Sequence, residues 1–175
     1  RKGKHIKSHS AYIHHKIFRS MHRKFRKILI FVKTATMKNE AFKDKVVVVT
    51  GGAQGIGHCI AQEFEKNGAR VYIIDKQEGP HYVGDIGRRE VLEAFTRHVV
   101  SREGHIDILV NNALPIMKGL DECTWDDFQY AMSVGVTAPF YLTKLMAPHF
   151  AQGASIVNIS SSRDRMSQPQ TESYT

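Results

Sequence analysis

Cysteine is scarce in this chain, which has only Cys59 and Cys123 among its 175 residues. Two cysteines without a framework spacing do not predict a disulfide, and they favour a reducing compartment, which we take to be the cytoplasm. We expect Cys59 to be a small buried thiol within a helix. Long apolar runs are missing as well, since the run ILIFV at 28–32 is far shorter than the ~20 residues that span a membrane. No membrane span is therefore expected.

Acidic residues are absent from the first 38 positions, which hold 12 Lys and Arg residues. The other 13 basic residues share positions 39–175 with all 17 acids, so that this part has a net charge of −4. The overall net charge of +8 therefore comes from an N-terminal arm. We expect no nucleic-acid binding by the folded domain.

The arm, residues 1–36, has apolar residues near helical spacing between Ile13 and Val32. One interpretation is translated upstream sequence or another non-native extension, because Met37 begins a compact lead into the first expected strand. The alternatives are a basic amphipathic helix that targets a mitochondrion, lies on an anionic membrane or contacts nucleic acid. We treat residues 1–36 as an extension outside the fold and residues 37–175 as one domain.

Strands and helices are expected to alternate from residue 45 onward. A run of four valines at 46–49 is typical of a buried parallel strand. Apolar segments that alternate with helical patterns predict a parallel sheet with right-handed crossovers. The predicted fold class is a doubly wound α/β sheet of the Rossmann-like type. The expected strands are 45–50, 70–74, 81–84, 106–111 and 155–160, and the expected helices are 56–67, 88–102 and 125–150.

The segment TGGAQGIG joins the first expected strand to the first expected helix. Glycine lets the backbone turn tightly and approach a ligand, and the first turn of a helix has unpaired N–H groups. A strand–glycine–helix corner therefore predicts a binding site for a dinucleotide pyrophosphate. We assign to this site Thr50, Gly51, Gln54, Gly55, Ile56 and Gly57.

Asp75 ends the second expected strand, 24 residues after Gly51. An acid at this place can hydrogen-bond the adenosine ribose hydroxyls and repel a 2′-phosphate. Gln54 in the glycine loop is neutral, and Lys76 is the only base nearby in the sequence. These charges favour NAD(H) over NADP(H) as the cofactor.

Four motifs in order resemble those of the short-chain dehydrogenase/reductase family, in its compact single-domain branch, over about residues 43–175. They are TGGAQGIG, the acid Asp75, the triplet Asn111-Asn112-Ala113, and Ser161 thirteen residues before Tyr174. The resemblance implies an NAD(P)-dependent oxidoreductase that interconverts an alcohol and a ketone or aldehyde. It also implies a small-molecule substrate and, for the full-length protein, a homodimer or homotetramer.

The resemblance assigns cofactor contacts to single residues. Asp85 and Ile86 would contact the adenine ring, although Asp85 could instead cap the helix that follows. Asn112 and Ala113 would border the nicotinamide ribose, while Asn111 would tie adjacent strands together.

The resemblance also assigns the proton-transfer chemistry. Tyr174 would donate or accept the proton at the substrate oxygen, and Ser161 would hydrogen-bond the same oxygen. Hydride transfer moves a proton on that oxygen, so a general acid or base must lie beside it. The alternative for Ser161 is a helix-cap or loop serine. Arg163 could contact an anionic substrate or be a solvated loop arginine.

The chain departs from the family pattern in several places. The lysine expected four residues after Tyr174 falls beyond Thr175, where the sequence stops. Gly135 stands where asparagine is common, and Leu114 stands where glycine is usual. Gly135 and Leu114 favour an alternative, a dinucleotide-binding family member without catalysis or an inactive fragment. We expect a fragment whose sheet is incomplete at the C-terminal edge and which by itself has little or no activity.

Two further groups of residues are expected to have structural roles only. Helix packing is the predicted role of Trp125, Phe128, Tyr130 and Met132. No metal site is predicted, because metal-like pairing is missing for His81, His98, His105 and His149.

Overall fold

The computed structural model describes residues 42–166 and 168–174, so the arm, with both interpretations of it, lies outside the described residues. The strands are β1 (Val46–Thr50), β2 (Arg70–Asp75), β3 (Tyr82–Val83), β4 (Ile106–Asn111) and β5 (Phe150–Asn158). The helices are α2 (Gly55–Lys66), α3 (Arg89–Glu103), α4 (Trp125–Met132) and α5 (Ala138–Met146), with the π-helix η1 (Ser133–Thr137) and the 3-10 helices η2 (Ala147–His149) and η3 (Ser162–Asp164). Within the described ranges, no helix has the length and apolar character needed to cross a bilayer.

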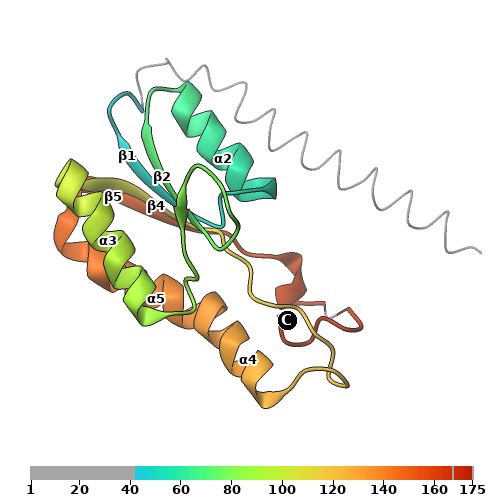
Figure 1. The fold of residues 1–175 in the computed structure, drawn as a ribbon. Coiled ribbons are helices and arrows are strands. Elements are labelled where there is room, and N and C mark those ends of the chain that lie inside the picture. Colours follow the sequence, from blue (N-terminus) through green and yellow to red (C-terminus); the bar gives the residue numbers. More distant parts are fainter. Residues whose placement is uncertain (1–41, 167, 175) are drawn as a thin grey trace, which may run out of the picture. The chain divides into compact units, whose positions relative to one another are not determined.

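The strands form one parallel sheet in the order β3-β2-β1-β4-β5 (Figure 1). The chain begins at the centre with β1, adds β2 and β3 on one side, and then returns to add β4 and β5 on the other. The order reverses between β1 and β4, and such a switch point is where doubly wound sheets bind ligands. The predicted fold class is confirmed.

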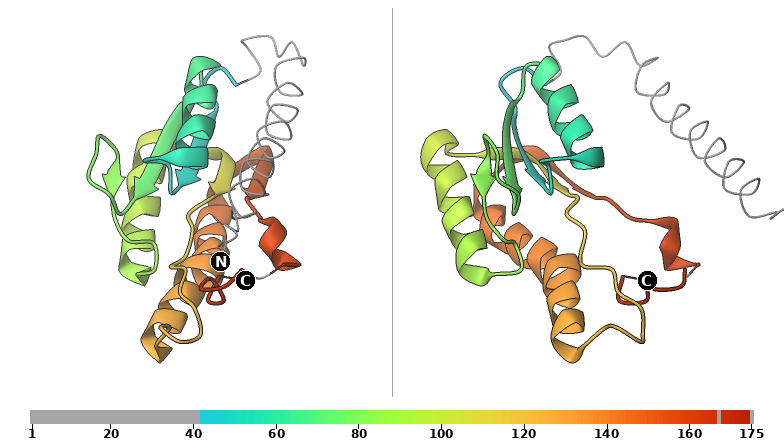
Figure 2. Two further views of the ribbon diagram at one scale, coloured as in Figure 1. Left: turned by 90° about the vertical axis from the view of Figure 1, so that its right-hand side faces the viewer. Right: turned by 45° about the vertical axis from the view of Figure 1, so that its right-hand side comes forward.

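Helices cover both faces of β1, and this explains its run of valines (Figure 2). Alternate side chains of a strand point to opposite faces. Val46 and Val48 pack in a cluster with residues of α3 and α5. Val47 and Val49 pack in a second cluster with Ala61 of α2. Because all four valines are fully buried, β1 has no polar face.

The helix predicted over 125–150 is present from Trp125 to His149, but it is not a regular α-helix throughout. The π-helix η1 separates α4 from α5, and in it the N–H of Ala138 donates to the carbonyl of Ser133, five residues back. Pro139 follows at the start of α5 and has no N–H to donate to the carbonyl of Gly135. The wider turn therefore lies where the ordinary helical hydrogen-bond ladder cannot continue.

Two other details differ from the predictions. β5 begins at Phe150 instead of residue 155, and its pairing with β4 has a register shift between Ile106 and Ile108, which lets the longer strand fit. Cys59 is exposed, so the prediction of a buried thiol is wrong. The reason is the helical period of α2, which turns Ala61 toward the sheet and Cys59 away from it.

The aromatic residues of α4 do not share the packing role that their spacing predicted. Trp125 is 77% exposed and Phe128 is 43% exposed. On the same helix, Tyr130 is half-buried and packs against the core cluster on the α3 side of the sheet. α4 therefore leaves large apolar side chains at the surface while it directs Tyr130 inward.

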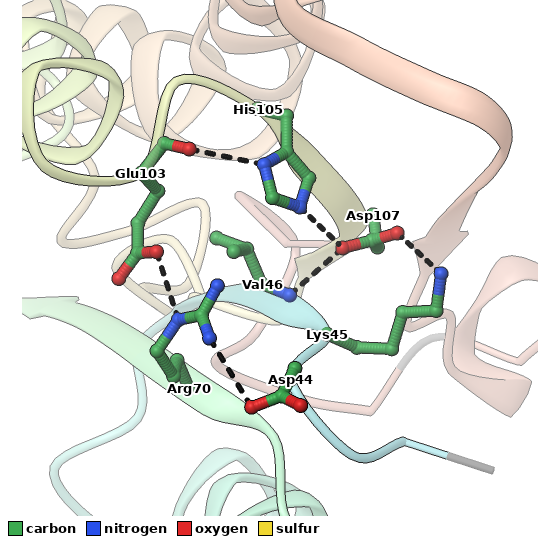
Figure 3. Close-up of polar contacts among 7 residues, drawn as sticks. All are labelled: Asp44, Lys45, Val46, Arg70, Glu103, His105 and Asp107. Atoms are coloured by element: carbon green, nitrogen blue, oxygen red, sulfur yellow. Dashed lines mark hydrogen bonds and ion pairs between the residues drawn. The ribbon is translucent and has the colours of Figure 1, made fainter.

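A charged network ties β1 to β4 at the amino ends of the strands (Figure 3). Asp107 accepts hydrogen bonds from Lys45 Nζ at 2.8 Å and from the Val46 N–H at 2.9 Å. Nε2 of His105 lies 3.2 Å from the same carboxylate. Burial alone would raise the pKa of Asp107, but its partners Lys45, Val46 and His105 hold this pKa below its usual value. The network lies at the edge opposite the glycine corner and stabilises the sheet.

Candidate functional site

The glycine corner connects β1 to α2 at the switch point of the sheet. Gly51 and Gly55 have φ angles of +67° and +59°, in the left-handed region that favours glycine. A Cβ added at Gly57 would lie 2.3 Å from the Gly51 carbonyl oxygen. Gln54, at the N-cap of α2, makes no side-chain cap hydrogen bond, and the first turn has no acid. Among the described residues, no side-chain cap thus competes with an anion for the N–H groups of this turn.

Asn112 and Thr50 hold the corner in place from the end of β4. The hydroxyl oxygen of Thr50 accepts hydrogen bonds from the backbone N–H groups of Asn112 at 3.0 Å and Ala113 at 3.1 Å. Nδ2 of Asn112 donates to the carbonyl oxygens of Thr50 at 3.1 Å and Gly51 at 2.9 Å. Thr50 is buried, and its hydroxyl joins the end of β1 to the residues that follow β4.

Asp75 contacts the glycine loop directly. One carboxylate oxygen accepts a hydrogen bond from the Ala53 N–H at 3.0 Å, and the other accepts one from the Gln77 N–H at 3.0 Å. Both bonds fix the carboxylate at the carboxyl end of β2. Each oxygen keeps a further lone pair, so the group can still accept a hydrogen bond from a ligand.

Asp85 lies in the turn between β3 and α3. Its carboxylate accepts hydrogen bonds from the Gly87 N–H at 2.8 Å and from the Tyr130 hydroxyl, which is 2.9 Å from both oxygens. Arg88, not Asp85, occupies the N-cap of α3, so the alternative prediction of a helix-cap role is wrong. Ile86 is buried and packs in the core beneath the turn. Burial and the neighbouring Asp85 raise the pKa of Tyr130 to about 12.

Ser161 and Tyr174 are separated by the short helix η3, and among the described residues no hydrogen bond joins them. The Ser161 hydroxyl accepts a hydrogen bond from the Arg163 N–H at 3.3 Å and caps η3, as in the alternative interpretation of this serine. The guanidinium carbon of Arg163 lies 5.8 Å from the centre of the Tyr174 ring. Both serine and tyrosine are half-buried.

The residue before Tyr174 is attached to the loop that follows β4. Ser173 Oγ accepts a hydrogen bond from the Lys118 N–H at 2.8 Å and donates one to the Ile116 carbonyl at 3.0 Å. The Ser173 N–H donates to the Lys118 carbonyl at 3.1 Å. Lys118 Nζ also lies 2.8 Å from Asp127, whose pKa it lowers to about 2 together with the Thr124 hydroxyl. No local sequence pattern indicates this connection, because it joins residues 55 positions apart.

The two positions that depart from the family pattern lie beside this loop. A Cβ added at Gly135 would be 3.3 Å from Cγ of Pro115. A larger side chain at this position must therefore displace Pro115 by a small amount. Leu114, which precedes Pro115 in the chain, is 59% exposed.

A hollow of about 190 Å³ lies between α3 and the segment η1–α5. Its lining is Ile86, Gly87, Arg89, Leu92, Ser133, Thr137, Ala138 and Tyr141. Ligand pockets for cofactors and drug-sized molecules measure roughly 300–1,000 Å³. The hollow is therefore too small for a dinucleotide and is separate from the glycine corner.

A parallel doubly wound sheet with a glycine corner at its switch point is typical of the class of Rossmann-like proteins that bind dinucleotides. Residues 45–175 match the family model described as short chain dehydrogenase. The chain belongs to the short chain dehydrogenase family.

Curated relatives agree with this family. The chain is 35% identical to momilactone A synthase from Oryza sativa subsp. japonica, over 75% of this chain and 55% of that protein. It is 33% identical to L-fucose dehydrogenase from Mus musculus, over 76% of this chain and 54% of that protein. The chain thus spans about half the length of the curated relatives it matches.

Solved structures of the family have the same fold. The ligand-free aldohexose dehydrogenase from Thermoplasma acidophilum superimposes with a TM-score of 0.68 at 28% identity and covers 76% of this chain and 55% of that one. A short chain dehydrogenase from Burkholderia cenocepacia in complex with NADP has a TM-score of 0.70 at 26% identity, over 76% of this chain and 62% of that one.

Proposed function

We propose that this chain is the cofactor-binding part of an NAD(P)-dependent oxidoreductase that interconverts an alcohol and a ketone or aldehyde by hydride transfer. The observation that carries the proposal is the contact between Asp75 and the glycine loop, where the Ala53 N–H donates to the carboxylate at 3.0 Å. An acid held beside a phosphate-binding turn suits a dinucleotide whose ribose hydroxyls need an acceptor. The reaction is proposed for the whole protein, since this chain spans about half the length of its relatives.

The residues of the corner fit a pyrophosphate. The first turn of α2 has no side-chain cap, so its N–H groups can bind an anion. Glycine at 55 has open space where a Cβ would stand, which leaves room for a ligand to approach. The proposed pyrophosphate site consists of Gln54, Gly55, Ile56 and Gly57, with Thr50 and Gly51 holding the corner beneath it.

The remaining contacts divide between the two ends of the cofactor. Asp75 would accept hydrogen bonds from the adenosine ribose, and its charge favours NAD(H) by repelling the 2′-phosphate of NADP(H). Asp85 and Ile86 would contact the adenine ring. Asn112 and Ala113, which are bonded to Thr50 at the end of β4, would lie beside the nicotinamide ribose.

The bound cofactor supplies or takes up the hydride, and residues of this chain would move the proton. Tyr174 is the proposed acid or base at the substrate oxygen, with Ser161 as a second hydrogen-bond donor to that oxygen. Three hydrogen bonds hold Ser173 to the loop 116–118, and this supports a defined position for Tyr174. The guanidinium of Arg163 near the tyrosine ring adds positive charge on this side of the site.

A dinucleotide-binding protein without catalysis is the second candidate function. It is favoured by Gly135, because any side chain at this position, including the asparagine that is common there, would require a small shift of Pro115. In the whole protein, Tyr174→Phe distinguishes the two candidates. If the variant loses turnover but still binds NAD as the wild type does, the enzyme is supported. If the wild-type protein itself has no turnover, the binding protein is supported.

The substrate would be a small-molecule alcohol or carbonyl compound. The names of the relatives include L-fucose, galactose and momilactone A, so they support the class of reaction and not one substrate. We further propose that residues 37–175 form the domain, that the protein is cytoplasmic, and that the whole protein is a homodimer or homotetramer. An exposed apolar face on α4, η1 and α5 supports self-association, and it contains Trp125, Phe128, Val136 and Phe140.

Calorimetric titration of the chain with NAD⁺ tests the cofactor site. Gly57→Ala should weaken binding by at least about tenfold, because the new methyl group would meet the Gly51 carbonyl oxygen and open the corner. Gly104→Ala is the control, since Gly104 lies at the end of α3, away from the corner, and an added Cβ there would meet no atom within 4 Å. Equal affinity of both variants and the wild type would refute the proposed pyrophosphate site.

A further inference from the structure

Tyr130 connects α4 to the turn after β3, 45 residues earlier in the chain. Its hydroxyl lies 2.9 Å from each oxygen of the Asp85 carboxylate, so one proton is shared between the two acceptors. The Gly87 N–H donates to the same carboxylate at 2.8 Å. Two donors from different elements therefore define the direction in which this carboxylate points.

The Tyr130 ring also packs against the turn itself. A Cβ added at Gly87 would lie only 2.8 Å from Cε2 of this ring, so glycine is required for the close approach. Tyr130 belongs to the residues packed against the large core cluster, which limits the rotation of its side chain. The ring and the hydroxyl thus hold the same turn, one by packing and the other by a hydrogen bond.

This turn is connected to the proposed ribose acceptor. The Gly84 N–H donates to the Asp75 carbonyl at 2.8 Å, and Asp75 pairs with Val83 in the sheet. Asp75 and Asp85 therefore lie at the same carboxyl edge of two neighbouring strands. A ligand bound through its ribose at Asp75 would have its base on the side of the β3 turn.

The chemistry of the pair leaves an acceptor available. A carboxylate has about four lone-pair sites, and the Gly87 N–H and the shared Tyr130 proton do not use all of them. Because the pKa of Tyr130 is raised to about 12, the hydroxyl stays protonated and remains a donor at every pH at which a cofactor would bind. The Tyr130 hydroxyl is therefore the donor of this pair and the Asp85 carboxylate the acceptor.

We propose that Tyr130 is a positioning residue that orients Asp85 to accept a hydrogen bond from the 6-amino group of adenine, so that the pair selects adenine over a 6-oxo purine. The inference rests on the proposed dinucleotide site. Hypoxanthine has an oxygen acceptor in place of the amino group, and an acceptor facing a fixed carboxylate is left without a donor. Selection at this atom needs the correct direction of the carboxylate, which Tyr130 provides.

The test compares the dissociation constants of NAD⁺ and of nicotinamide hypoxanthine dinucleotide for the wild type and for Tyr130→Phe. The wild type should prefer NAD⁺ by about tenfold or more, equivalent to one lost hydrogen bond to a charged group. Tyr130→Phe should reduce this preference to about threefold or less while binding the hypoxanthine form almost unchanged. Tyr72→Phe is the matched control, because Tyr72 also donates to a carboxylate, Glu103 at 2.7 Å, away from the turn.

Asp85→Asn provides a second readout if Tyr130→Phe does not fold. An amide can donate to the oxygen of hypoxanthine, so the preference should move toward the hypoxanthine form. A full preference for NAD⁺ in Tyr130→Phe, or an unchanged preference in Asp85→Asn, would overturn the inference. A wild-type chain that binds neither dinucleotide would instead refute the proposed function on which it rests.

Discussion

Asn112 donates a hydrogen bond from its side-chain amide to the carbonyl oxygen of Gly51 at 2.9 Å, and so joins the end of β4 to the glycine corner. A Cβ at Gly57 would lie 2.4 Å from the same amide nitrogen. The corner is therefore a three-way contact between β1, α2 and β4. A change in any one of these elements should alter the shape of the proposed pyrophosphate site.

Asn112→Ala should weaken NAD⁺ binding by about tenfold and lower the free energy of unfolding by about 1–3 kcal/mol, because two carbonyl oxygens lose their donor. Calorimetric titration and urea denaturation measure the two effects. Asn67→Ala is the control, since Asn67 also donates to a carbonyl, that of Glu63 at 2.7 Å, but at the exposed end of α2. If both variants lose the same affinity, the corner does not depend on Asn112.

Asp75→Asn should change the choice of cofactor. The amide keeps an acceptor for one of the two backbone N–H groups but removes the charge that repels a 2′-phosphate. The ratio of the dissociation constants of NADP⁺ and NAD⁺ should fall by about tenfold or more. Asp126→Asn, at an exposed position in the first turn of α4, is the control. A ratio that stays constant in Asp75→Asn would contradict the proposed ribose contact.

Acid should remove the stabilisation that Asp107 provides. Since its pKa in the folded chain lies below the unfolded value of about 3.9, its contribution is present above that pH and is lost as the pH falls through the folded pKa. Asp107→Asn should therefore lower the free energy of unfolding by about 1–3 kcal/mol at pH 7. The difference from the wild type should shrink below about pH 4. Denaturation curves between pH 7 and pH 2.5 measure this.

Asp44→Asn is the matched variant for this pH experiment. Asp44 contacts Arg70 at 3.5 Å, and its side chain is 74% exposed, so solvent screens the pair. Its denaturation curve should follow that of the wild type at every pH. A constant difference between Asp107→Asn and the wild type down to pH 2.5 would mean that packing, and not charge, accounts for the effect.

Ser173→Ala should loosen the segment that holds Tyr174. The Lys118 N–H loses its acceptor, so its hydrogen exchange should become about tenfold faster, equivalent to one hydrogen bond of ordinary strength. Ser101→Ala removes an exposed hydroxyl that donates to the His98 carbonyl at 3.2 Å and serves as the control. Unchanged exchange at Lys118 would show that the backbone bond of Ser173 alone holds the segment.

Local sequence patterns predicted the parts of this structure that depend on near neighbours. The valines of β1 and the glycines after it determine a buried strand and a tight corner by themselves. The π-helical turn before Pro139 is local as well, but the helical spacing of the apolar residues on either side of it concealed this irregularity. The pairing of Tyr130 with Asp85 depends on the packing of α4 against the β3 turn, and no local pattern contains that information.

The same distinction applies to the proposed catalytic residues. Their thirteen-residue spacing identified Ser161 and Tyr174, but a spacing does not determine the orientation of two side chains in a loop. The structure gives Ser161 a local partner, the Arg163 N–H, since a serine before a short helix finds its nearest donor there. The hydrogen bonds of Ser173 join segments 55 residues apart and were equally invisible in the sequence.

The outer strand β5 should govern how the isolated chain behaves at high concentration. β3 at the other side of the sheet has only two residues, whereas β5 has nine, and Ile156 and Val157 on it are 43% and 42% exposed. Within the described ranges β5 pairs with β4 alone, so its other edge offers a template for a strand of a second molecule. We expect the isolated chain to precipitate by strand addition at this edge, and Ile156→Lys to suppress that precipitation.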